Sequence, residues 1–162
     1  MTSSQSYPSS IMGAFALIKQ VYYDADWYSK GLSKTNDKSL EALNRNKNLI
    51  QIFEAKSKIN SLRIDKIGDE FNIQYVLLGG GDEFERIEEI KATNASYILP
   101  INFPDAYDIE DVYSANILQL SDMREWNQRP SNLSQFEENG IQFAITMDGL
   151  KSPNNLKTNI KK

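Results

Sequence analysis

The sequence predicts an α/β fold with at least four parallel strands, and three observations support this. Four short apolar runs rich in β-branched residues occur, at 49–53, 73–78, 97–101 and 141–146. Segments with the three- and four-residue period of helices separate them. The strand starts near 49, 73, 97 and 141 are spaced by 24, 24 and 44 residues, and a step of 24 holds one strand, one helix and two short loops. Alternating strands and helices predict parallel strands joined by right-handed crossovers.

Two helices are expected before the first strand. Apolar residues form one stripe through residues 11–29, because they recur at three- and four-residue steps. Ser9 or Ser10 is placed to cap the start of this helix, and Gly31 is placed to end it. A shorter helix is expected over 37–46.

Most of the strand runs are nearly continuous in apolar residues, which is typical of strands buried on both faces. Three of the runs follow a helical segment that ends in a small turn, at 70–72, 93–95 and 138–140. The expected helices lie at 57–71, 82–94 and 114–128, and Pro130 ends the last one. The longest step also leaves room for an extra loop, residues 102–113.

Two architectures fit this order of elements. One is a small open sheet with helices on both faces. The other is about half of an eight-stranded β/α barrel, since a complete barrel needs about 250 residues and the chain has 162.

The composition excludes several classes of protein and site. The chain has no cysteine and no histidine, 18 Lys and Arg, and 22 Asp and Glu. It therefore lacks disulfides, thiol nucleophiles, iron–sulfur ligands and the commonest metal ligand and general base. A net charge of −4 argues against nucleic-acid or anionic-membrane partners. No apolar stretch approaches 18 residues, and residues 1–10 lack the pattern of a signal peptide, so we expect a soluble chain.

Ligands gather at the carboxyl ends of parallel strands, and four sets of residues are expected there, at 53–56, 79–82, 102–104 and 147–149. Gly79 begins a glycine run that opens a helix, so a phosphate site is one interpretation. The acidic residues at 82, 83 and 85 favour the alternative, a tight turn in which the helix dipole attracts carboxylates.

Two further groups have a chemical and a structural interpretation. Asp148 follows a strand and precedes Gly149. It is therefore either a chemical group, as a metal ligand or general base, or a turn residue. The Asp-Gly pair favours the turn. Glu54 and Lys56 either form an ion pair at the end of the first strand or are independent solvated charges, and the second interpretation is favoured.

Three segments carry a resemblance to a known family. Residues 68–80 resemble the second half of the amidohydrolase superfamily barrel, and residues 7–14 and 140–149 are similar to one branch of that superfamily, as residues 68–80 also are. That branch is the imidazolonepropionase-like amidohydrolases of bacteria, whose members are often periplasmic or secreted. The resemblance covers most of residues 5–160.

The resemblance implies a fold and a chemistry. Family members hydrolyse C–N bonds of cyclic amides or dipeptides with zinc or another divalent ion, which is bound by histidines and by an aspartate on the last barrel strand. Only Asp148 matches such a position, as a vestigial ligand and general base. The fifth-strand histidine falls at Phe53 or Glu54 and the sixth-strand one at Gly79, and neither is histidine. We therefore expect a fragment, the C-terminal half of a degenerate barrel, without a metal and without activity of its own.

The predicted organisation is a disordered or extended segment at 1–10 followed by a partial barrel domain at 11–162. The alternative to a degenerate hydrolase is a non-enzymatic structural module that dimerises through open strand edges. The expected partner is the remaining half of the barrel or a second copy of the chain. A free-standing α/β binding domain is a third possibility.

Overall fold

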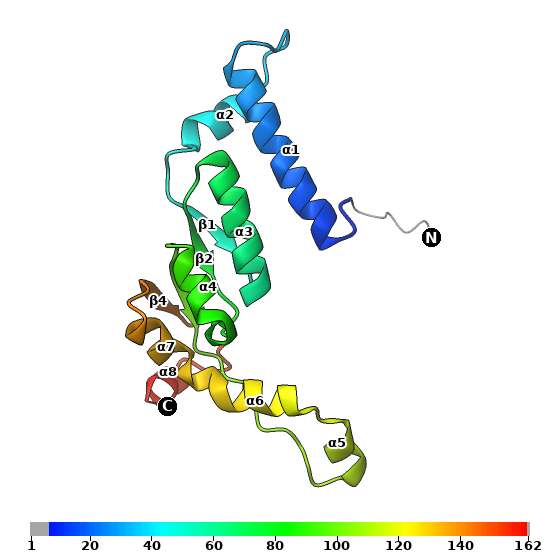
Figure 1. The fold of residues 1–162 in the computed structure, drawn as a ribbon, viewed down its shortest axis with the longest axis vertical. Coiled ribbons are helices and arrows are strands. Elements are labelled where there is room, and N and C mark those ends of the chain that lie inside the picture. Colours follow the sequence, from blue (N-terminus) through cyan, green and yellow to red (C-terminus); the bar gives the residue numbers. More distant parts are fainter. Residues whose placement is uncertain (1–6, 162) are drawn as a thin grey trace. The chain divides into compact units, whose positions relative to one another are not determined.

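The computed structural model describes residues 7–161 and divides into two compact units (Figure 1). The first unit contains the described residues up to Leu49 together with Glu70–Ile73. The second contains Ile50–Asp69 and the chain from Gln74 onward. Of the ten residues expected to be extended or disordered, the first six lie outside the described residues, and the next four precede the first helix without regular structure.

The first unit is helical, and its two helices begin at side-chain caps. Helix α1 (Ile11–Ser29) has the predicted bounds, and the Ser10 hydroxyl accepts a hydrogen bond from the Gly13 amide at 3.1 Å. Gly31, just beyond its end, has a φ of 72°, a conformation that glycine adopts without strain. Helix α2 (Lys38–Asn46) is capped by the Asp37 carboxylate.

Aromatic and charged contacts hold α1 against Glu70–Ile73 within this unit. The Phe71 ring stacks on Tyr22, with centroids 4.9 Å apart, and meets the edge of Tyr23 at 5.0 Å. The Glu70 carboxylate accepts hydrogen bonds from Lys19 and Tyr23. The Lys19 ammonium and the Tyr23 hydroxyl hold the pKa of Glu70 below its usual range.

The second unit contains a four-stranded parallel sheet in the order β1-β2-β3-β4. The strands are β1 (Gln51–Glu54), β2 (Tyr75–Leu78), β3 (Ser96–Pro100) and β4 (Phe143–Thr146). Each strand therefore lies beside the next one along the chain. This is the α/β architecture that the sequence predicts. Its order also lacks the reversal at which a doubly wound sheet changes direction.

The helical connections mostly match the predicted ones, with two divisions that the sequence does not indicate. Helix α3 (Lys58–Phe71) precedes β2, and the expected helix at 82–94 divides into η1 (Glu83–Arg86) and α4 (Ile87–Ala92). The expected helix at 114–128 divides into α5 (Val112–Ile117) and α6 (Leu120–Gln128). The remaining helices are η2 (Arg129–Ser131), α7 (Asn132–Glu138) and α8 (Asn155–Ile160).

The three small turns expected before the strands are present, and their backbone explains their sequence. Asn72, Asn94 and Gly140 have φ values of 56°, 53° and 69°. Asparagine and glycine are the residues that enter this left-handed region most readily. Each of these turns therefore ends a helix and redirects the chain into β2, β3 or β4.

One face of the sheet is covered and the other is open. Tyr75, Leu77, Tyr97 and Leu99 alternate along β2 and β3 and are buried. The opposite face, here called the open face, is half-buried or exposed; its residues are Ile52, Glu54, Val76, Leu78, Ser96, Ile98, Pro100, Ala144 and Thr146.

The burial on both faces that the continuous apolar runs predict is therefore not observed. Right-handed crossovers between strands in sequential order place the connecting helices on one side of the sheet. An apolar run does not reveal which of its two faces receives that cover. None of the helices within residues 7–161 is long and apolar enough to cross a membrane.

Candidate functional site

The carboxyl ends of the four strands meet at one edge of the sheet and form a cleft of about 250 Å³. Lys56 follows β1, Gly79 and Gly80 follow β2, Asn102 follows β3, and Asp148 follows β4. The structure thus brings together at least one member from each of the four sets that the sequence places at the strand ends. Parallel strands produce this convergence because all their carboxyl ends lie at the same edge.

Asp148 lies in a turn, as the Asp-Gly pair predicts. The Leu150 amide donates to the Met147 carbonyl at 3.0 Å, and Gly149 has a φ of 74°. A positive φ at the third position is what a type II turn requires. The Asp148 side chain is exposed beside the cleft, and its amide donates to the Thr146 hydroxyl at 3.2 Å.

Glu54 and Lys56 form the ion pair that the sequence analysis considers less favoured. Their charged atoms lie 2.7 Å apart, yet the side chains are 52% and 71% exposed. The pKa of Lys56 is raised mainly by Glu54, with a smaller contribution from Asp148. Because both partners are well solvated, the pair contributes little to stability.

The other two positions that match lost histidines are occupied by packing residues. Phe53 lies in register with Leu77 on the covered face, and its ring meets that of Tyr75 at 5.5 Å. At Gly79 a Cβ atom would lie 2.5 Å from an oxygen of Glu83. Only glycine fits at this position without displacing that carboxylate.

Glu83 is the main feature of this edge that the sequence analysis does not single out. Its carboxylate is completely buried and accepts hydrogen bonds from the amides of Gly80 at 2.6 Å and Gly81 at 3.0 Å. The side-chain amide of Asn132, on α7, donates to it at 3.0 Å. Burial raises the pKa of Glu83, and the hydrogen bonds from the Gly80 amide and the Asn132 side chain oppose that shift.

The Glu83 contacts decide against the phosphate interpretation of the glycine run. Two of the amides that would face a bound anion already donate to a carboxylate of the chain itself. A Cβ atom at Gly80 would lie 2.3 Å from the Lys56 carbonyl oxygen, so the glycine also permits two loops to approach closely. The run is a tight turn closed by an internal acid.

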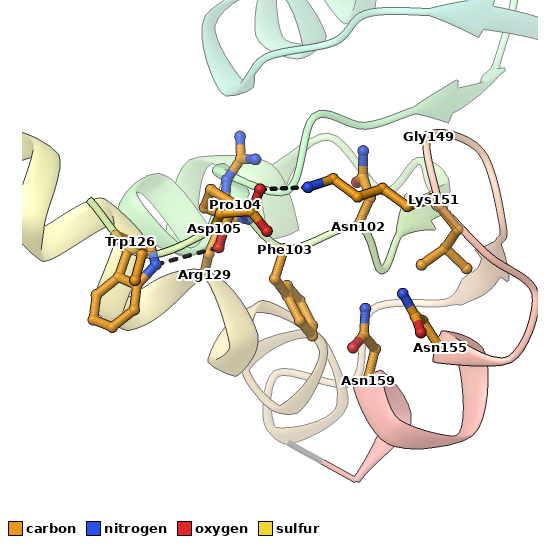
Figure 2. Close-up of a pocket in the computed structure, with 12 residues that line it drawn as sticks. Asn102, Phe103, Pro104, Asp105, Trp126, Arg129, Gly149, Lys151, Asn155 and Asn159 are labelled. Carbon is orange, nitrogen blue, oxygen red and sulfur yellow. Dashed lines mark hydrogen bonds and ion pairs between the residues drawn. The ribbon is translucent and has the colours of Figure 1, made fainter. Parts of the chain in front are cut away.

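A larger cleft of about 600 Å³ adjoins the strand-end cleft and shares Asn102 with it. Its walls come from the loop after β3, the end of α6 and the segment from Gly149 to α8 (Figure 2). The Trp126 indole N–H donates to the Pro104 carbonyl at 3.2 Å, and Lys151 pairs with Asp105. The sequence analysis finds only residues 102–104 and Gly149 of this cleft, because its other residues, two asparagines among them, form no motif.

The residues at the strand ends do not fit the divalent ion that the amidohydrolase resemblance implies. Within residues 7–161, no group of three or more carboxylate, histidine or cysteine side chains is placed to hold a metal ion. In the strand-end cleft, the carboxylate of Asp148 lies among amide, glycine and lysine groups. Zinc sites need three or four carboxylate, histidine or cysteine ligands, so the side chains of this cleft do not suit a zinc ion.

The chain was compared with known proteins at three levels. No family model, curated protein sequence or solved structure matches it.

Proposed function

We propose that this chain is a non-enzymatic β/α module that pairs through the open face of its sheet and acts as about half of a β/α barrel. The observation that carries the proposal is the exposure of apolar side chains on that face. Ile52, on the edge strand β1, is 64% exposed, and Ala144, on the opposite edge strand β4, is also exposed on this face. Val76, Leu78 and Ile98 lie between them and are only half-buried.

Two physical terms favour a partner for this face. Removing apolar surface from water stabilises a complex by about 25 cal/mol per Å². The outer edges of β1 and β4 pair with no other strand among residues 7–161, and such edges present free N–H and C=O groups to a partner strand.

The occupant that we propose is a second copy of the chain. Two copies supply eight parallel strands, the number that closes a β/α barrel. A two-fold axis along the strands brings β4 of each copy beside β1 of the other in parallel orientation. Two-fold symmetry is the commonest symmetry of homo-oligomers.

The amidohydrolase resemblance gives this proposal its second part, the origin of the module. We propose that the chain corresponds to the C-terminal half of a barrel of that type, with Asp148 as the vestige of the metal site. The support is the order of the resembling segments along the sequence and the place of Asp148 after β4.

The pairing proposal is tested by light scattering during size exclusion at several protein concentrations. We expect a dimer whose population rises with concentration. Ile52→Lys and Ala144→Glu place a charge on the open face and shift the chain to monomer. Ile117→Lys is the matched control, because Ile117 is 78% exposed on α5 and is not one of the open-face residues, and it leaves the dimer intact.

A monomer at all concentrations, with no binding of an apolar dye, contradicts pairing. Dissociation by Ile117→Lys but not by the open-face variants contradicts the choice of surface. The origin of the module is tested separately, with amidase and dipeptidase assays in added Zn²⁺ or Mn²⁺. We expect negligible turnover, and turnover that Asp148→Asn abolishes would demonstrate a working site.

A further inference from the structure

We propose that the larger cleft beside the sheet binds a small neutral saccharide. The cleft holds about 600 Å³, within the range of small-molecule sites in proteins. It combines three asparagine side chains, Asn102, Asn155 and Asn159, with the aromatic rings of Phe103 and Trp126. Figure 2 shows the Asn155 and Asn159 amides close together with the Phe103 ring beside Asn159, and Asn102 apart from this pair.

Both cations at the cleft form ion pairs, one with a residue of the lining and one with a residue outside it. Lys151 pairs with Asp105 at its rim. The Arg129 guanidinium lies 3.3 Å from the Glu125 carboxylate. Each cation therefore has an anionic partner, which weakens the attraction of the cleft for a carboxylate or phosphate.

The groups of the lining without a hydrogen-bond partner among the described residues are two neutral amides and the buried Nε–H of Arg129. The side chains of Asn102 and Asn155 make no hydrogen bond to another described residue. Asn159 uses its N–H₂ group to donate to the Ile101 carbonyl at 2.7 Å, which leaves its amide oxygen as an acceptor. An amide both donates and accepts hydrogen bonds, and so does each hydroxyl of a sugar.

Local structure places these amides before any ligand arrives. Asn155 and Asn159 are four residues apart on α8, so they lie on one face of the helix. A Cβ atom at position 149 would lie 2.2 Å from the Asn102 amide nitrogen, so Gly149 leaves the space that this side chain occupies. Asn102 lies two residues after the end of β3.

The aromatic rings suit the apolar side of a sugar ring. The Trp126 indole N–H is satisfied by the Pro104 carbonyl, so the polar edge of the ring is fixed, and the side chain is 39% exposed. Tryptophan offers a large, flat apolar surface, and the C–H groups of a pyranose form a surface of matching shape. Amides for hydroxyl groups and a ring for C–H groups together define the ligand class.

The test is an amide nitrogen–proton correlation spectrum of the full chain, titrated with neutral sugars. The probes are methyl glucoside, methyl galactoside and N-acetylglucosamine, with glucuronate and inorganic phosphate as the charged comparison. The chain has two tryptophans, so Trp27 on α1 serves as an internal control for Trp126. We expect a saturable shift of the Trp126 indole signal with at least one neutral sugar at millimolar concentration, and no shift for Trp27.

The variants identify the cleft. Asn155→Ala removes a free amide and weakens binding about five- to tenfold, which corresponds to one hydrogen bond. Asn154→Ala is the matched control, because Asn154 is exposed, adjacent in sequence and outside the cleft lining, and it binds like the parent chain. The absence of a saturable shift, equal weakening by both variants, or tighter binding of phosphate or glucuronate would overturn the proposal.

Discussion

Replacing Glu83 with alanine removes the acceptor of three N–H groups at the carboxyl end of β2. These groups are the amides of Gly80 and Gly81 and the side-chain amide of Asn132. Gly81 and Asn132 are buried, while Gly80 is half-buried and has some access to water. The substitution therefore leaves two donors without any partner and a third that water satisfies only in part.

The magnitude follows from these burials. An unsatisfied buried donor costs about 1–3 kcal/mol, and the half-buried one costs less, so Glu83→Ala destabilises the second unit by about 3 kcal/mol. Part of this loss is offset. Burial raises the pKa of Glu83 because burying its charge is unfavourable, and alanine removes that unfavourable term. Glu83→Gln keeps one acceptor oxygen and the side-chain volume, so it destabilises less than alanine.

The assay combines urea unfolding followed by circular dichroism with hydrogen exchange at the Gly80 and Gly81 amides. We expect Glu83→Ala to lower the unfolding free energy and to remove protection at both amides. Glu88→Ala is the control, because Glu88 is an exposed acid on α4. Equal effects of the two alanine variants, or retained protection at both glycine amides, would refute the role of Glu83 as the closing acid.

Three further predictions concern stability. Burial and a second aspartate one turn along α3 raise the pKa of Asp65 to about 6, so its contribution to stability is complete below about pH 4 and is lost as the pH rises through about 6. In urea titrations we therefore expect Asp65→Asn to stabilise the chain at pH 7 by about 1 kcal/mol, after allowance for solvent screening, and to have little effect at pH 3.5. Gly80→Ala places a Cβ atom against the Lys56 carbonyl and should lower the free energy of unfolding, measured by thermal unfolding, by about 2 kcal/mol or more. Gly31 has a positive φ but open space around it, so Gly31→Ala should lower that free energy by only about 1 kcal/mol. The pKa of Glu70 is lowered by its contacts with α1, so the stability that Glu70 contributes is present at neutral pH and is lost as the pH falls through the lowered pKa. Glu70→Gln should therefore speed hydrogen exchange along α1 at pH 7 and should differ little from the parent chain in strong acid.

Local signals in the sequence predict most of the fold. The bounds of α1 and the three turns at Asn72, Asn94 and Gly140 follow from periodicity, capping and backbone preference. The sequence does not predict the division of residues 114–128 into α5 and α6, or the exposure of Ile117 and Met123 on them. Periodicity identifies an apolar stripe but not whether another element covers it.

The candidate site is likewise predictable from the sequence only in part. The convergence of Lys56, Asn102 and Asp148 follows from strand order, because consecutive strand ends of a parallel sheet lie together. The role of Glu83 does not follow, since an acid near a helix start is equally explained by the helix dipole. Its burial depends on Asn132, which lies 49 residues further along the chain, and no local pattern reports such a distant contact.

The open face and the saccharide cleft occupy different parts of the second unit, so their functions are separable. The face runs along the sides of the strands, whereas the cleft lies beyond their carboxyl ends. Pairing about an axis parallel to the strands leaves the cleft of each copy open at the same mouth of the completed barrel. We therefore expect Ile52→Lys to produce a monomer that still shifts the Trp126 indole signal with sugar. We expect Asn155→Ala to produce a dimer that binds sugar weakly. Loss of both properties in either variant would show that the pairing surface and the cleft form a single site.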